Sequence, residues 1–243
     1  MRVGFEVEVE QSNNTSNNIP GLKITPDGSL RNGVEYVSDV LPDTKYASWL
    51  YEYLHEYIEG EYTERCGVHV HLDFSHCSVP DLLDFVFRYL AIERALFRKY
   101  PEHLRGNNSF CRPLLDSSNE LEVLRRLWQN PEERNTLQAF SKYTALNLRT
   151  ICTLGTVEFR PLSGGTSPVV FTEVLKTLEQ LVNGEETDLQ SPVSDILEAN
   201  VVVDSIKYST DEYVSNPDEF IHEVFQTSPQ TLTTESVRLY LEQ

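Results

Sequence analysis

Short segments that alternate between apolar and polar residues constrain the fold of this chain more than any other feature. The clearest is "CGVHVHLDF", residues 66–74, in which His69 and His71 alternate with Val68 and Val70. Successive side chains of a β-strand point to opposite faces of the sheet, so both imidazoles share one face. The pattern predicts a strand with an apolar face and a face that can bind a ligand.

Four further segments follow the same pattern and carry ionisable or amide groups on one side. The polar positions are Glu6 and Glu8 in "GFEVEVE", Glu35 in "GVEYVS", Asn147 and Arg149 in "KYTALNLRT", and Glu158 and Arg160 in "GTVEFRPL". If the five strands belong to one sheet, their polar faces coincide, and helices can cover the opposite face.

Apolar residues recur at helical spacing in three longer segments, 43–60, 78–101 and 167–184. Residues 117–128 and 130–140 read as two shorter capped helices. Together with the alternating segments they predict an α+β fold. We interpret the tyrosine-rich run "WLYEYLHEY" of the first helix as a packing surface.

The charge balance excludes several classes of function. The chain has 20 Lys and Arg against 38 Asp and Glu, a net charge of −18 that repels nucleic acid phosphates and offers no polybasic membrane patch. Its four cysteines form no CxxC pair, and no apolar run resembles a signal peptide or a membrane span. We therefore expect a cytoplasmic protein without direct nucleic acid or membrane binding.

The combined polar face predicts a site for metal ions and an anion. Crowded carboxylates repel one another unless cations neutralise them, and oxygen-rich sites with an occasional imidazole suit Mg²⁺ or Mn²⁺. Guanidinium groups suit phosphate, so a nucleoside triphosphate satisfies both requirements. The chain has neither a GxxxxGK nor a GxGxxG motif, so metal ions would hold the phosphates.

Each motif also has a simpler interpretation. Alternating glutamates on a surface strand commonly face solvent, Glu158 and Arg160 could form a cross-strand pair, and a half-exposed strand could carry both histidines in water. The combination of five such segments in one chain favours the metal and anion site.

The motifs also resemble a known family. "GFEVEVE", "DGSL" followed by "GVEYVS", "CGVHVHLD", "NSFCRP", "KYTALNLR" and "GTVEFRPLSGGT", in this order, are similar to the amidoligases, ATP-dependent carboxylate-amine ligases related to glutamine synthetase and gamma-glutamylcysteine ligase. The resemblance implies a catalytic domain at 1–185. Residues 186–243 fall outside it and read as a C-terminal helical appendage or lid.

The resemblance implies a curved antiparallel sheet of the glutamine synthetase type, with helices on its outer face and ATP and two or three divalent metals on its concave face. The implied metal ligands are Glu6, Glu8, Asp27, Glu35, His69 and Glu158. His71 would face a nucleotide phosphate, and Arg160, with Arg149, would stabilise the transferring phosphoryl group. Lys142, Asn147 and Arg112 would position a substrate. Asp27 stands where glutamine synthetase has a glutamate, and the large N-terminal region of that enzyme is absent from this chain.

The implied activity joins a carboxylate to an amine through an acyl phosphate and releases ADP and phosphate. Amino acids, peptides or other amines are the expected substrates, and a homo-oligomer is left open. Two alternatives remain: a non-catalytic metal-nucleotide module in assembly or regulation, and a metal-dependent hydrolase, because HxH strands also occur in amidohydrolase barrels. The sequence lacks the eightfold strand and helix alternation of such a barrel.

Overall fold

The structure is a computed structural model that describes residues 1–12, 19–106, 108–191, 234 and 238. Six strands form one sheet in the order β2-β3-β1-β4-β6-β5, and every pair of neighbours in it is antiparallel. The elements are β1 (Val3–Val9), β2 (Leu22–Asp27), β3 (Gly33–Ser38), α1 (Thr44–Tyr57), β4 (Gly67–Asp73), α2 (Val79–Lys99), η1 (Leu114–Asp116), α3 (Ser118–Gln129), η2 (Arg134–Ala139), β5 (Leu146–Asn147), η3 (Arg149–Cys152), β6 (Thr156–Ser163) and α4 (Pro168–Asn183).

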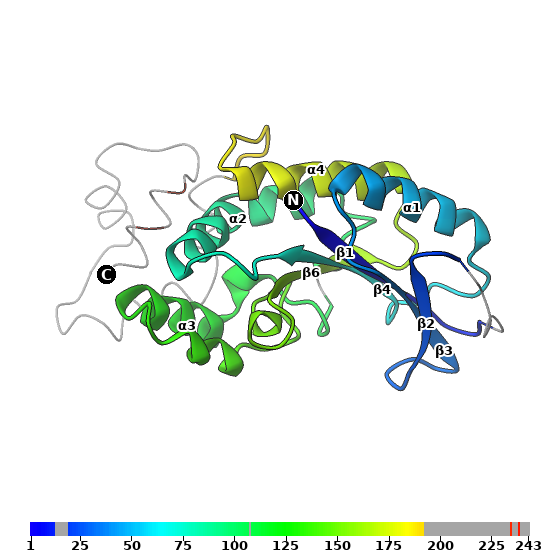
Figure 1. The fold of residues 1–243 in the computed structure, drawn as a ribbon, viewed down its shortest axis with the longest axis horizontal. Coiled ribbons are helices and arrows are strands. Elements are labelled where there is room, and N and C mark those ends of the chain that lie inside the picture. Colours follow the sequence, from blue (N-terminus) through cyan, green and yellow to red (C-terminus); the bar gives the residue numbers. More distant parts are fainter. Residues whose placement is uncertain (13–18, 107, 192–233, 235–237, 239–243) are drawn as a thin grey trace.

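The α+β class is therefore confirmed, with an open antiparallel sheet. Helices α1, α2 and α4 cover one face of this sheet (Figure 1). The alternating apolar residues face them: Phe5 of β1 makes edge contacts with Tyr51 of α1 and Phe171 of α4. Tyr89 of α2 packs in the same way on Phe159 of β6. Burial of this apolar face leaves the polar residues of the same strands on the opposite side.

The helix boundaries follow the capping signals in the sequence. Asp43 accepts a hydrogen bond at the start of α1, and Ser78 forms a capping box with Asp81 at the start of α2. Helix α4 begins after the cap residue Ser167 and ends at Gly184, which adopts the left-handed conformation with φ of 73°. The three long helices are thus confirmed. Residues 130–140 form only the short 3-10 helix η2.

Two strand predictions needed correction. The alternating segment "KYTALNLRT" contributes only the two-residue strand β5, because the chain turns into η3 at Arg149. Conversely, residues 22–27 form the edge strand β2, which was not among the predicted strands. Asp27 therefore lies at the end of a strand that pairs with β3, beside Glu35.

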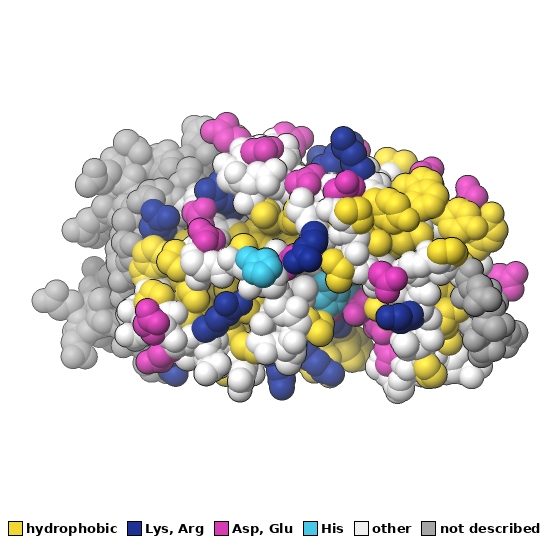
Figure 2. Space-filling model, viewed as in Figure 1, with side chains coloured by type: hydrophobic (Ala, Val, Ile, Leu, Met, Phe, Trp, Pro, Cys, Tyr) yellow, Lys and Arg dark blue, Asp and Glu magenta, His cyan; other side chains and the backbone are white. Residues whose placement is uncertain are grey.

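The interpretation of the tyrosine-rich run as a packing surface is wrong for most of its aromatic residues. Trp49, Tyr53 and Tyr57 are exposed and follow one another along the outside of α1, whereas Tyr51 is buried. Figure 2 shows this hydrophobic surface at the upper right of the molecule, where Figure 1 places α1. Helical spacing predicted the helix, but it did not decide which of two aromatic faces packs on the sheet.

The predicted C-terminal appendage lies almost wholly outside the described residues. Of the expected helical stretches at 193–200, 216–226 and 233–242, the structure describes residues 234 and 238, which have helical backbone. Within the described part of the chain, no helix is long and apolar enough to cross a membrane.

Candidate functional site

Strands β1 and β4 bring the first three polar residues together. Glu6 pairs with His69 in the antiparallel register, and the imidazole Nδ1 of His69 lies 3.2 Å from Oε2 of Glu6. The other ring nitrogen, Nε2, lies 3.8 Å from Oε2 of Glu8. Glu8 also accepts a hydrogen bond of 2.7 Å from the backbone N–H of Gly67. His69 and Glu8 are buried, so this imidazole lies between two carboxylates with little access to water.

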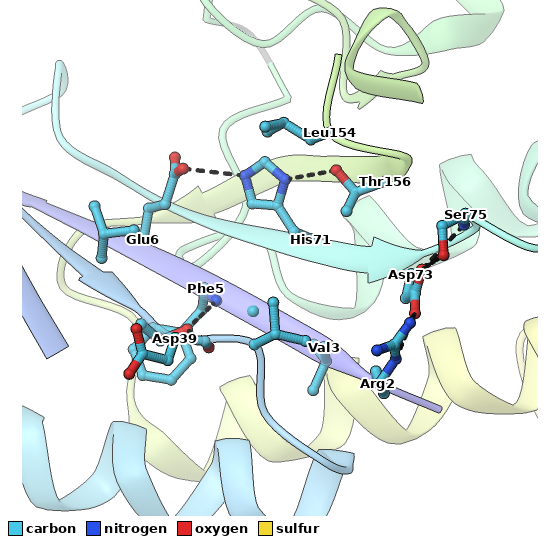
Figure 3. Close-up of a pocket in the computed structure, with 14 residues that line it drawn as sticks. Arg2, Val3, Phe5, Glu6, Asp39, His71, Asp73, Ser75, Leu154 and Thr156 are labelled. Atoms are coloured by element: carbon cyan, nitrogen blue, oxygen red, sulfur yellow. Dashed lines mark hydrogen bonds and ion pairs between the residues drawn. The ribbon is translucent and has the colours of Figure 1, made fainter. Parts of the chain in front are cut away.

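The second histidine of the strand connects the cluster to β6. Nε2 of His71 lies 3.2 Å from Oε1 of Glu6, and Nδ1 lies 3.0 Å from the hydroxyl of Thr156. Figure 3 shows the ring held between these two partners. Because both ring nitrogens are engaged, the orientation of the ring is fixed from two sides.

Glu158 of β6 completes the central group. Its Oε1 lies 3.4 Å from Nδ1 of His69, and its Oε2 accepts a hydrogen bond of 2.6 Å from the side-chain amide of Asn147. Arg160, two residues further along the same strand face, forms an ion pair with Glu158. Asn147 and Arg160 therefore fix the orientation of the buried Glu158 carboxylate, which could also act as a ligand of a metal ion bound in the cluster.

The hairpin of β2 and β3 supplies the remaining carboxylates. Glu35 pairs with Glu8 across β1 and β3, and it faces Thr25 across β2 and β3. Asp27 is held at the hairpin turn, where its two carboxylate oxygens accept hydrogen bonds from the N–H and hydroxyl of Ser29 at 2.7 and 2.9 Å. The turn thus fixes Asp27 beside Glu35 despite its short side chain.

The electrostatics of the cluster reflect this crowding. Burial and the neighbouring charges of Glu6 and Glu8 raise the pKa of Glu35 to about 8. Burial acts in the same direction on Glu6, but hydrogen bonds with His69 and His71 outweigh it and hold the pKa of Glu6 well below its usual range. The pKa of His71 is raised, because the hydrogen bond and charge of Glu6 overcome the effect of burial.

Seven acidic and histidine residues form three overlapping groups that could each hold a metal ion. The groups are Glu6, His71 and Glu158; Glu6, Glu35 and His69; and Glu8, Asp27 and Glu35, with the ligand atoms of each group within 4.8 Å of one another. All six residues predicted as metal ligands are among them. His71, for which we expected a phosphate contact, belongs to the first group. Carboxylate oxygens with one imidazole fit Mg²⁺ or Mn²⁺ better than zinc.

A cavity of about 230 Å³ lies over this cluster and brings in residues from distant loops. Lys142 lines it, in agreement with its predicted position near a substrate. Arg65, Arg105, Phe110 and Tyr143 also line it, and sequence reasoning missed all four. Arg65, Arg105 and Phe110 lie outside the alternating segments, so no periodic signal marked them, whereas Tyr143 belongs to the alternating segment "KYTALNLRT" but was not recognised as a site residue.

Two predicted residues do not reach the cluster. Arg149 was expected on the polar face of the sheet, and this placement is wrong: its side chain is exposed at the start of η3 and does not line the cavity. Arg112 is also exposed, and its contribution is a backbone bridge to Thr144. Of the guanidinium groups predicted from the strands, only that of Arg160 lies at the cluster.

A second cavity, of about 360 Å³, opens on the other side of Glu6 and His71. Its lining combines the exposed apolar side chains of Val40 and Leu154 with a polar end formed by His71 and Asp73 (Figure 3). Asp73 forms an ion pair of 2.5 Å with Arg2. The two cavities share Glu6, so a ligand in the second cavity can contact the cluster.

Comparison with protein families identifies the chain. The model of a family described as "putative amidoligase enzyme" matches residues 8–167, which is more than half of the sequence. The chain belongs to the amidoligase family. Membership in this family indicates a ligase enzyme. No match was found among curated proteins.

The amidoligase match covers most of the cluster, from Glu8 through Asp27 and the HxH strand to Glu158 and Arg160. Glu6 precedes the matched range but pairs directly with His69. Arg105, which the sequence analysis missed, and Lys142, which it predicted, also lie within the matched range. The polar face of the amidoligase sheet is therefore the candidate active site.

Proposed function

We propose that this amidoligase is an ATP-dependent carboxylate-amine ligase of the glutamine synthetase type that uses Mg²⁺ or Mn²⁺. The observation that carries the proposal is the set of three overlapping ligand groups, with the guanidinium of Arg160 paired to one of their members. This arrangement supports a site that holds divalent cations and a polyanion together.

The residues of the cluster fit divalent cations. Five carboxylates lie in the three groups, and their mutual repulsion contributes to the raised pKa of Glu35. Cations bound there would supply positive charge to the phosphates and to the developing charge of the transferring phosphoryl group. Asn147 holds Glu158 in the orientation in which its other oxygen faces His69.

The reaction proceeds in two steps. A substrate carboxylate oxygen attacks the γ-phosphorus of ATP, the bond to ADP breaks, and an acyl phosphate forms. The amine nitrogen then attacks the acyl carbon, a C–N bond forms, phosphate leaves, and the nitrogen loses a proton. Arg160 carries a permanent charge beside the cluster, and it stabilises negative charge on the phosphoryl oxygens in the first step. Lys142 lies on the rim of the same cavity and contributes a second positive charge.

The second cavity suits the nucleoside part of ATP. Its apolar walls can accommodate a base, while Glu6 and His71 mark the end at which phosphates would meet the cluster. Nδ1 of His71 is held by Thr156, and Nε2, which lies beside Glu6, is the nitrogen that would donate a hydrogen bond to a phosphate oxygen. The carboxylate substrate then enters from the cavity lined by Arg105 and Lys142, on the opposite side of Glu6.

Phosphate release from ATP tests the proposal. The full chain is incubated with ATP and Mg²⁺ or Mn²⁺ across pools of amino acids, peptides and amines, and products are weighed by mass spectrometry. A product with the mass of acid plus amine minus water establishes the ligase. Metal-dependent cleavage of amides without ATP would favour the hydrolase, and ATP binding without turnover in any pool would favour the non-catalytic module.

A further inference from the structure

An exposed row of aromatic side chains runs along the outside of α1. Its members, here called the aromatic row, are Tyr46, Trp49, Tyr53 and Tyr57, at spacings of three and four residues. Between 40% and 54% of each residue is exposed. Neighbouring ring centroids lie 5.4, 6.0 and 4.6 Å apart, so the row is continuous along the helix.

The size of the aromatic row is that of an interaction site. Four half-exposed aromatic rings present roughly 400 Å² of surface, and continuous apolar patches of this size commonly bind a partner. This area is about half of the ~800 Å² that one partner contributes to a typical interface. The row can therefore form the centre of an interface, and the charged residues around it would form the rim.

Acidic residues border the aromatic row on one side. Glu52 follows Trp49 by three positions and Glu56 follows Tyr53 by three, which places both carboxylates on the same flank of the helix. Both glutamates are exposed. Lys45 is the one lysine or arginine in α1. Figure 2 shows acidic side chains next to the hydrophobic surface of this helix. The rim of the row is therefore negative.

This negative rim narrows the class of partner. A second copy of the chain would bring a net charge of −18 and the same acidic flank. Residues 192–243, most of which lie outside the described part of the chain, contain ten Asp and Glu against two Lys and Arg. Both occupants would place like charges against Glu52 and Glu56, as would an anionic lipid surface. A basic partner would instead pair with these carboxylates and place cations against the rings.

We propose that the aromatic row binds a basic amphipathic helix of another protein. Such a helix would lie along α1, with its apolar residues against the rings and its Lys or Arg side chains over Glu52 and Glu56. Helix α1 covers one face of the sheet, whereas the three metal-ligand groups lie on the opposite face (Figure 1). The partner therefore occupies the row without blocking the candidate active site, and this inference does not depend on the proposed function.

Designed peptides of about 18 residues, long enough to form a helix, test the inference. The first peptide has Leu along one helical face and Lys on the other. The second has Glu in place of Lys, and the third has the composition of the first in an order that forms no apolar face. Each is titrated into the full chain by calorimetry, with and without Mn²⁺. We expect the first peptide to bind at least about tenfold more tightly than the other two, because charge and apolar contacts act together.

Two outcomes of this titration would overturn the inference. Equal affinities for the three peptides would show that the surface selects neither charge nor an apolar face. Loss of binding in Mn²⁺ would place the lysine peptide at the acidic cluster of the sheet, where divalent cations compete with it. Binding of the first peptide that is independent of Mn²⁺ supports the aromatic row.

Substitutions locate the bound peptide. Trp49→Ser removes an exposed ring, and we expect it to weaken binding of the lysine peptide about tenfold at an unchanged unfolding temperature. Glu52→Gln combined with Glu56→Gln should weaken the same peptide about threefold to tenfold. Glu132→Gln combined with Glu133→Gln is the matched control, because it removes the same charge from exposed positions before η2 and should leave the affinity unchanged. Affinity that ignores Trp49, or equal losses in the two double variants, would contradict the assignment.

The other occupants give different results. Sedimentation of the chain alone should show no dimer that depends on the row, and a dimer that Trp49→Ser dissociates would assign the row to a second copy. The chain has two tryptophans, so Trp128→Phe leaves the emission of Trp49 as the signal. We expect the lysine peptide to shift this emission and neutral phosphatidylcholine vesicles to leave it unchanged. A larger shift with the vesicles would assign the row to a lipid surface and overturn the basic helix.

Discussion

The guanidinium of Arg105 occupies the space that a side chain at Gly67 would fill. A Cβ atom at residue 67 would lie 2.2 Å from Nη2 of Arg105, closer than any real contact. Gly67 is the first residue of the HxH strand, and its N–H donates a hydrogen bond to Glu8. Because glycine has no side chain, the guanidinium of Arg105 can pack directly against the strand backbone beside the cluster.

Gly67→Ala should therefore displace Arg105. We expect the substitution to lower the free energy of unfolding by about 1–3 kcal/mol, the range for overpacking of a dense site. Urea denaturation measures this change. Gly28→Ala is the matched control, because a Cβ atom there meets nothing within 4 Å, and it should shift stability by less than about 0.5 kcal/mol. If Arg105→Ala does not reduce the effect of Gly67→Ala in a double-mutant cycle, the steric explanation is wrong.

Divalent metal should stabilise the fold through the cluster. At a hundredfold excess over the dissociation constant, Mn²⁺ should add about 2.7 kcal/mol to the free energy of unfolding, and a chelator should remove it. Glu8→Gln and Glu158→Gln should lose most of this gain, because each removes a carboxylate from one of the three ligand groups. Thermal unfolding with and without Mn²⁺ checks this. Glu122→Gln on α3 is the control, and an equal loss there would argue against binding at the cluster.

Arg160 should separate binding from chemistry. If it stabilises the transferring phosphoryl group, Arg160→Ala keeps nucleotide binding but lowers kcat by about 10²–10³, as for other preorganised charges. Calorimetry with a non-hydrolysable ATP analogue and phosphate release measure the two quantities. An equal loss of nucleotide affinity in Arg160→Ala and Glu158→Gln would contradict the separate roles.

The buried carboxyl of Glu93, which lies outside the candidate active site, should make the free energy of unfolding depend on pH. Its carboxylate lies buried in α2 and accepts hydrogen bonds from the N–H groups of Leu114 and Leu115 at 2.7 and 2.8 Å. Burial outweighs these bonds and raises its pKa from 4.5 to about 7. The folded state therefore holds the proton more tightly than the unfolded chain, so its contribution to stability is complete below pH 4.5 and is lost as the pH rises through 7.

The loss over this window amounts to about 3 kcal/mol as an upper bound. Glu93→Gln cannot titrate, and its amide leaves one backbone N–H without an acceptor, so the variant is less stable than the wild type at pH 5. We expect this difference to shrink at pH 8. Urea denaturation of both proteins at the two pH values checks the prediction, and a difference that is independent of pH would contradict it.

The sequence by itself determined the face on which each strand residue lies. In an alternating strand each residue points to one of the two faces of the sheet. Burial of Phe5 and Val7 against the helices therefore places Glu6 and Glu8 on the opposite face. The same argument applies to the HxH strand and to Glu158 and Arg160. Capping residues in the same way marked the starts of the long helices, because their hydrogen bonds are local.

The tertiary structure alone decided which distant residues join this face. Arg105 lies in a segment without periodicity, and only the packing of its loop on β6 and the gap at Gly67 place it beside His69. Arg149 does not lie on the polar face of the sheet, and the reason is a local hydrogen bond that the alternating pattern does not reveal. The side-chain oxygen of Asn147 accepts a hydrogen bond of 2.9 Å from the N–H of Arg149, and this competing bond turns the chain into η3 after two strand residues.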